Sequence, residues 1–360
     1  MKKTIQRAIV ITFIAFVLGG CTLKKNDTTS SPEKDQPLLP AEDFITHHLL
    51  TEQGLIRTTF ANPPIYLSES LGLWMDYLIR KKDQSSFDKQ INLIKKHFLL
   101  EDQLLTWKIA NDKKSNVNAL IDDLRVVHAL NQADEMWQKS DYRNLALEIA
   151  RALKEKSMYK GIFTDYYDVS AKQTSQSITL SYIDPNAISD LNTLGVINDK
   201  TLSRQLSIIQ QAPRKNDFFP KSYDIDAAHY SFDADLNLID QLYTALHAAD
   251  MKVDTASFMT WLQQTFKKEG KLFGRYHLTS KEPSVTFESP AVYALSMLYA
   301  LKMDQPAFAL DIYQRMKQLE IQDPLKPYYG GYLNEKETHS FDNLLPLIAE
   351  RELLNEAIIQ

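Results

Sequence analysis

Apolar residues recur at intervals of three and four positions along most of the chain beyond residue 40. Two runs show the spacing, at Phe87, Ile91, Ile94 and Phe98 and at Leu236, Ile239, Tyr243 and Leu246. This spacing places the apolar side chains on one face of an α-helix, and no long alternating run indicates a β-strand. The sequence therefore predicts an all-α domain.

Six helix-start signals follow one another roughly 50 residues apart, which indicates an internal repeat of one helical hairpin. Each offers a capping side chain, and two are followed by proline; they are Ser68, Asn118, Asp184, Ser231, Ser289 and Ser340. Second helices fit at 42–51, 85–100, 141–156, 199–211, 254–268 and 304–319. We expect an (α/α)6 barrel of about twelve helices, with the loops that lead into the inner helices gathered at one mouth. An open solenoid or an irregular all-α domain is the alternative, because such signals are common in helical proteins.

The first forty residues have a different pattern. Basic Lys2, Lys3 and Arg7 precede an apolar run at 8–18 and the small residues Gly19 and Gly20. This order is typical of a secretory signal, and the apolar run is too short to span a bilayer well. The stretch from Thr22 to about Pro40 is polar and rich in Pro and Ser, as in a flexible tether.

The segment Leu18-Gly19-Gly20-Cys21 resembles the bacterial lipoprotein signal, in which the cysteine becomes the acylated first residue. The resemblance implies a signal peptide at 1–20, a tether at 21–40 that carries a lipid such as palmitate on Cys21, and a domain at 41–360. The protein would then be extracytoplasmic and held at the cell membrane. A simple secretory leader or a buried thiol is the alternative reading of Cys21.

Composition limits the partners of the chain. Its 360 residues, 44% of them hydrophobic and 24% charged, suffice for one large domain or two small ones with a sizeable core. The formal charge is −5, and loss of three basic leader residues would leave 38 basic against 46 acidic residues, or −8. This excess of acids argues against nucleic acid as a partner. Cys21 is the only cysteine, so the domain has no disulfides, and we expect a monomer.

The polar residues favour hydrolysis by carboxylates. The eight histidines do not form a metal-binding spacing, and neither a nucleophile elbow nor a phosphate loop is present, so no metal and no cofactor is expected. Glu69 and Asp233 each fall in the first turn of a predicted inner helix, and Asp122 and Asp123 fall in another. A single acid there can simply complement the helix dipole. Several acids at one mouth instead suit the acid and base that cleave a glycosidic bond.

Aromatic residues near these helix starts and in the loops are candidates for binding sugar rings through their faces. They are Trp74, Trp107, Tyr182, Tyr230, Tyr328 and Tyr329. A position on the surface without any ligand contact fits any one of the tyrosines equally well.

Several segments together resemble glycoside hydrolase family 8, whose members have an (α/α)6 barrel and an inverting mechanism. Residues 68–75 look like the S-E-G-x-G-Y-G-M segment that carries the general acid, here Glu69. Residues 118–124 and 180–185 resemble the N-x-A-T-D-x-D-L and P-S-Y-x-x-P elements, and 232–234 resembles the Y-D-A that carries the base, here Asp233. Ile121 stands where the family has an aspartate at its central sugar site, so either Asp122 replaces it or the substrate differs.

The resemblance implies an inverting endo-glycoside hydrolase that acts on a β-linked exopolysaccharide or cell-surface glycan. Two alternatives remain at this point. One is a noncatalytic sugar-binding lipoprotein on a decayed barrel, which the altered acid segment would favour. The other is a different (α/α)6 carbohydrate enzyme, such as a lyase.

Overall fold

The computed structural model describes residues 38–359. The predicted signal peptide, the predicted acylation site at Cys21 and nearly all of the predicted tether lie outside the described residues. Within 38–359, none of the helices has the length and apolar character needed to cross a membrane.

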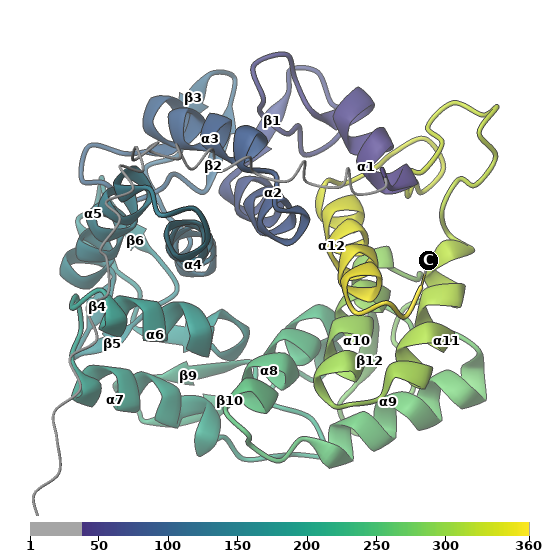
Figure 1. The fold of residues 1–360 in the computed structure, drawn as a ribbon. Helices are drawn as coiled ribbons and strands as arrows, with labels where there is room; N and C mark the ends of the chain where they lie inside the picture. The colour runs from purple at the N-terminus through teal and green to yellow at the C-terminus, as the bar shows by residue number, and fades with distance from the viewer. Residues whose placement is uncertain (1–37, 360) are drawn as a thin grey trace, which may run out of the picture. The chain divides into compact units, whose positions relative to one another are not determined.

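Six helices form an inner ring in which each packs against the next (Figure 1). They are α2 (Ser68–Lys81), α4 (Leu120–Trp137), α6 (Pro185–Thr193), α8 (Leu238–Asp250), α10 (Pro290–Lys302) and α12 (Phe341–Asn355). The last helix, α12, also packs against α2 and so closes the ring. A short 3-10 helix, η3 (Leu180–Tyr182), precedes α6 and packs against α8.

Six further helices surround this ring. They are α1 (Pro40–Phe44), α3 (Gln84–Leu93), α5 (Ser140–Lys156), α7 (Asp199–Gln210), α9 (Ala256–Glu269) and α11 (Pro306–Lys317). The chain continues from α1 and α3 into the π-helical turns η1 (Ile45–Leu49) and η2 (Ile94–Phe98). The described chain thus has twelve α-helices in two concentric layers, and the predicted (α/α)6 barrel is confirmed.

The difference between the layers is visible in the sequence of single helices. In the outer helix α5 the buried residues recur at three and four positions and face the ring, as in Tyr142, Leu145, Ala146 and Ile149. The inner helix α10 is buried almost all round, from Ala291 to Ala300, because it has neighbours on every side.

Short antiparallel strands occupy the loops. The strands that precede inner helices are β1 (Ile65–Leu67), β8 (Ser177–Thr179) and β11 (Asp235–Asn237). Strand β1 pairs with β2 (Lys108–Ala110), which also pairs with β3 (Lys113–Lys114). Strand β8 pairs with β9 (Ser222–Asp224), which also pairs with β10 (His229–Ser231), and β11 pairs with β12 (Arg275–His277). Two separate pairs are β4 (Met158–Tyr159) with β5 (Ile162–Phe163) and β6 (Tyr167–Asp168) with β7 (Gln173–Thr174). In the register of these pairs Tyr66 faces Ile109, Tyr223 faces both Ile178 and Tyr230, and Leu236 faces Tyr276. The strands anchor the loops at the mouth, the barrel end that carries the N-termini of the inner helices.

Five of the six predicted inner-helix starts lie within two positions of a real one, and the sixth is wrong. Ser231 ends strand β10, and α8 begins only at Leu238, where the side chain of Asn237 caps the helix by accepting a hydrogen bond from Ile239 N at 3.0 Å. Between them lie an irregular link at 232–234 and the strand β11, which pairs with β12, about forty positions further on. Asp233 is therefore not a helix residue.

Candidate active site

Glu69 lies in the first turn of α2, between the buried residues Ser68 and Ser70. Burial of its carboxyl group raises the pKa of Glu69 to about 7. The carboxylate of Asp122 adds to this effect, Arg125 opposes it, and Asp342 raises the pKa further. A glutamic acid with a pKa near 7 still holds its proton in much of the population at neutral pH, as a general acid requires.

Asp122 connects this turn to the next inner helix. Its Oδ2 accepts a hydrogen bond from Ser68 Oγ at 2.7 Å, and its Oδ1 accepts one from Arg125 Nη1 at 3.0 Å. Gly72 on α2 makes room for the arginine, because a Cβ there would lie 3.0 Å from Cδ of Arg125. Asp122, Arg125 and the start of α2 thus form one buried polar unit beside Glu69.

Asp123 does not line the mouth, although we predicted it to contact sugar. Its side chain has no exposed surface and accepts hydrogen bonds from Leu105 N at 2.9 Å and Asn118 Nδ2 at 2.5 Å. Asn118 Oδ1 in turn accepts one from Tyr167 N at 2.6 Å. Burial raises the pKa of Asp123 to about 8. Asp123 holds two loops of the mouth in place and is a structural residue.

Trp74 also lies away from the mouth. It is 3% exposed and stacks on Tyr77, with 5.3 Å between ring centroids. Five positions along a helix correspond to a rotation of about 140° from Glu69, which turns Trp74 toward the interior of the barrel wall. It is a core residue, not a sugar contact.

Trp107 and Tyr182 are the predicted aromatic residues that lie beside the acid. The carbonyl of Trp107 accepts a hydrogen bond from Ser68 N at 3.2 Å, and its ring is 39% exposed. Tyr182 ends η3 and is half-buried. Burial and the charges of neighbouring carboxylates raise the pKa of Tyr182 above its usual range; these carboxylates are Asp165, Asp122, Asp240 and Glu69.

The other predicted tyrosines have contacts of different kinds. Tyr230 packs against Tyr223 at 4.8 Å, and its hydroxyl donates to the carbonyl of Ile208 on α7 at 2.6 Å. Tyr328 is 37% exposed and stacks on Phe60 at 5.2 Å. Tyr329 follows it and is half-buried. A sugar contact by any of these three stays a prediction.

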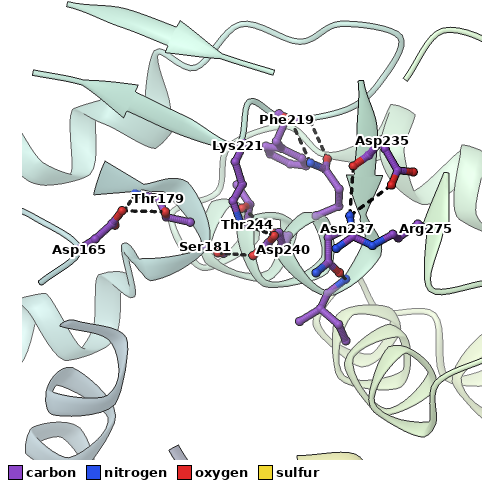
Figure 2. A network of polar contacts seen from close by, with 12 residues as sticks. Asp165, Thr179, Ser181, Phe219, Lys221, Asp235, Asn237, Asp240, Thr244 and Arg275 are labelled. Carbon is purple, nitrogen blue, oxygen red and sulfur yellow. Dashed lines mark hydrogen bonds and ion pairs between the residues drawn. The ribbon is translucent and has the colours of Figure 1, made fainter. Parts of the chain in front are cut away.

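Asp233 is exposed and lies in the link between β10 and β11, five positions before α8. Two other carboxylates lie on the approach to this helix (Figure 2). Asp235 in β11 pairs with Arg275 at 3.3 Å. Asp240, in the first turn of α8, accepts hydrogen bonds from Ser181 Oγ at 2.9 Å and Lys221 Nζ at 2.5 Å. We did not single out Asp240 from the sequence, because the start of α8 was placed too early.

A cavity of about 560 Å³ lies beside Asp342, between the loops that lead into α10 and α12. Asp342 Oδ1 accepts a hydrogen bond from Ser289 Oγ at 2.7 Å. Phe287, 53% exposed, and His339 also line this cavity. Asp342, which lines this cavity, is also one of the carboxylates that raise the pKa of Glu69. Its volume is within the range of ligand pockets, and an exposed aromatic ring beside carboxylates suits a sugar.

Among residues 38–359, no group of three or more His, Cys, Asp or Glu side chains is placed to hold a metal ion.

Comparisons with known proteins give one relative by sequence and several by structure. No profile of a known protein family matches the chain. A protein of Bacillus subtilis (strain 168) with the name "Putative lipoprotein YdaJ" is 44% identical over 358 residues, which cover 98% of each chain.

Among solved structures, a novel alpha-amylase from Clostridium perfringens has a TM-score of 0.80 and 24% identity, over 87% of this chain and 96% of that one. PssZ from Listeria monocytogenes has a TM-score of 0.73 and 27% identity, over 88% and 96%. The endoglucanase Cel10 from Klebsiella pneumoniae, a family 8 glycosyl hydrolase, has a TM-score of 0.63 and 14% identity, over 87% and 98%. The barrel is thus of the kind found in family 8 and related glycoside hydrolases.

Proposed function

We propose that this chain, which belongs to the same family as YdaJ of Bacillus subtilis, is a lipid-anchored polysaccharide hydrolase with Glu69 as general acid and Asp233 as general base. The observation that carries the proposal is the state of Glu69. A glutamic acid with a pKa of about 7 lies at the mouth of a barrel of the family 8 kind, in the segment that resembles the acid segment of that family.

In the proposed reaction Glu69 gives its proton to the glycosidic oxygen as the bond from the anomeric carbon to that oxygen breaks. A water molecule forms the new bond to the anomeric carbon from the opposite face, and its proton passes to Asp233. An inverting enzyme keeps the two carboxyl groups roughly 6.5–9.5 Å apart so that the water fits between them. The product then has the opposite anomeric configuration.

Asp233 is the proposed base because it matches the family motif and is exposed to water. The two neighbouring acids have other partners, since Arg275 pairs with Asp235 and Lys221 pairs with Asp240. A nearby cation stabilises the ionised form of a carboxylate and so weakens it as a proton acceptor. The activities of Asp235→Asn and Asp240→Asn should therefore be measured together with that of Asp233→Asn.

The substrate we propose is an internal bond of a β-linked exopolysaccharide or cell-surface glycan, in keeping with the names of the endoglucanases among the structural neighbours. The alpha-amylase from Clostridium perfringens adds α-linked glucans to the polymers that need testing. The name of YdaJ supports a lipid on Cys21 and a place outside the cytoplasm, next to a polymer exported through the same membrane.

The decisive experiment compares Glu69→Gln and Asp233→Asn with wild type on a panel of α- and β-linked polysaccharides. We expect both variants to lose about 10²–10⁴ in the rate of reducing-end release and to keep polymer binding. Glu148→Gln, on the exposed face of α5, is the matched control and should keep full activity.

Proton NMR of the first product tests the stereochemistry, and an anomer with the configuration of the substrate would contradict inversion. Loss of activity in Asp240→Asn but not in Asp233→Asn would transfer the role of base to Asp240. Wild-type protein that binds a polymer and releases no reducing ends would make it a noncatalytic sugar-binding lipoprotein.

A further inference from the structure

The interior of the barrel contains a second cavity, of about 610 Å³, that all six inner helices line. On α2 its lining runs from Leu73, one turn beyond Glu69, to Arg80 in the last turn. Along α12 it runs from Leu345 to Glu356, the residue directly after the helix. On five of the inner helices the lining thus runs from the middle of the helix toward its C-terminal end, whereas the short α6 contributes its N-cap, Asp184, and Asn186. Its volume is within the usual range for sites that hold small molecules.

Two arginines, one lysine and His128 line this cavity and have acidic partners, whereas His247 lines it too and forms no ion pair among the described residues. Arg80 pairs with Asp76 at 2.9 Å, Arg125 with Asp122 at 3.0 Å and His128 with Asp190 at 2.6 Å, and Lys302 pairs with Asp250. An anion that entered would therefore find no unpaired cation among the described lining residues. A neutral or positively charged ligand suits the cavity better.

Asp184 is a carboxylate of the lining that forms no ion pair in the described part of the chain. Its Oδ1 caps α6 by accepting hydrogen bonds from Asn186 N at 2.9 Å and Ala187 N at 3.1 Å. Burial alone would raise the pKa of Asp184, but His247, His128 and the two backbone N–H groups lower it, so the group is ionised at neutral pH. Both of these hydrogen bonds go to Oδ1, and none of the described residues donates one to Oδ2, so this oxygen can accept a hydrogen bond from a cationic ligand even with His128 nearby.

His247 on α8 lines the same cavity and is 7% exposed, and its Nδ1 has no hydrogen-bond partner among the described residues. Burial lowers the pKa of His247, although Asp184 acts in the opposite direction. A neutral imidazole has one nitrogen that accepts a hydrogen bond. Helices α10 and α12 supply an apolar wall to the same space, with Leu295, Leu298 and Ile348.

We propose that this cavity is a second ligand site, which takes a small organic cation the size of one sugar ring, with its ammonium group held by Asp184 and His247. The apolar wall would contact the body of the ligand. An amino sugar has this combination of a protonated amine and a ring with apolar faces. The inference goes beyond the proposed hydrolysis and does not depend on Glu69.

Isothermal titration calorimetry with purified full-length protein tests the proposal, with D-glucosamine as the probe and D-glucose as its neutral counterpart, at a slightly acidic pH that keeps the amine protonated. We expect glucosamine to bind at least about tenfold more tightly than glucose, a difference on the scale of one charged hydrogen bond. Asp184→Asn should remove this preference while the helix stays capped, because asparagine is as good an N-cap as aspartate. Glu69→Gln should leave glucosamine binding unchanged.

Three results would overturn the proposal. They are no binding of glucosamine, equal affinities for the two sugars, and loss of binding in Glu69→Gln but not in Asp184→Asn, which would place the amine at the mouth. Leu298→Trp supplies an independent check, since an indole would fill the cavity from the α10 side and abolish binding. If circular dichroism shows that Asp184→Asn or Leu298→Trp does not fold, His247→Phe replaces that variant. It keeps an aromatic ring but removes the hydrogen-bond acceptor.

Discussion

Glu69 shows how one residue obtains its chemical state from several helices. The start of a helix favours a charged carboxylate, since the N-terminus carries partial positive charge. Burial outweighs that effect here, and the acids of α4 and α12 add to it. Arg125 limits the shift, so the pKa stays near 7 and does not rise beyond the range useful for proton transfer.

Asp342→Asn tests this account at the level of the residue. Activity should fall as pH rises through the pKa of Glu69, because only the protonated acid is active. Removal of the Asp342 charge lowers that pKa, so the alkaline limb of the kcat/KM profile should move to lower pH by on the order of half a unit. Asp311→Asn, on the exposed face of α11, is the control and should leave the profile in place. An alkaline limb that stays put in Asp342→Asn would mean that its charge does not act on the acid.

Helix α8 shows which elements local sequence can predict. Five inner-helix starts were found because a polar residue, in two cases with proline, stands directly before the apolar run. At Ser231 the same signal is present, but residues 232–234 form an irregular link and Asp235–Asn237 are held as strand β11 by pairing with β12, so the helix starts only at Leu238. A strand partner that lies forty positions away cannot be recognised from local periodicity.

The predictions for the site divide in the same way. Glu69 and Asp122 lie in the first turns of inner helices, as predicted, because each stands directly at a helix start. Trp74 is close to Glu69 in sequence, which favours a place at the mouth, but its angle around helix α2 turns the side chain into the core. Asp342 was not predicted, although it lies two positions after Ser340 in the first turn of α12, where the rule that indicates Glu69 and Asp122 also applies.

Asn237→Ala tests the observed start of α8. We expect a loss of about 1 kcal/mol in the free energy of unfolding, because the amide oxygen no longer accepts the Ile239 N–H. Ser231→Ala, at the start expected from sequence, should change stability by less than about 0.5 kcal/mol. Urea denaturation followed by circular dichroism measures both. Equal losses in the two variants would contradict a cap at Asn237.

At the scale of the whole molecule, the proposed function needs the chain to stay next to its polymer. Cys21→Ala should remove the site of acylation, so the protein should move from the membrane fraction to the soluble fraction. Cell fractionation with metabolic labelling by a palmitate analogue measures both location and acylation. Wild-type protein with an unmodified thiol in the medium would contradict the lipid anchor and leave the assignment of the barrel intact.

Closure of the ring also has a consequence for when the protein can fold. The first inner helix, α2, packs against the last, α12. A 2.7 Å hydrogen bond joins the hydroxyls of Ser70 and Ser340, and an ion pair joins Arg80 and Glu352. Until the ribosome has made α12, the α2 face that it covers has no partner, and contacts so distant in sequence form slowly. A chain that crosses a membrane in the unfolded state would benefit from this delay, because it must not fold before it has crossed. A stop codon just before residue 341 would give a product that exposes apolar surface of both α2 and α10, and such surfaces promote aggregation.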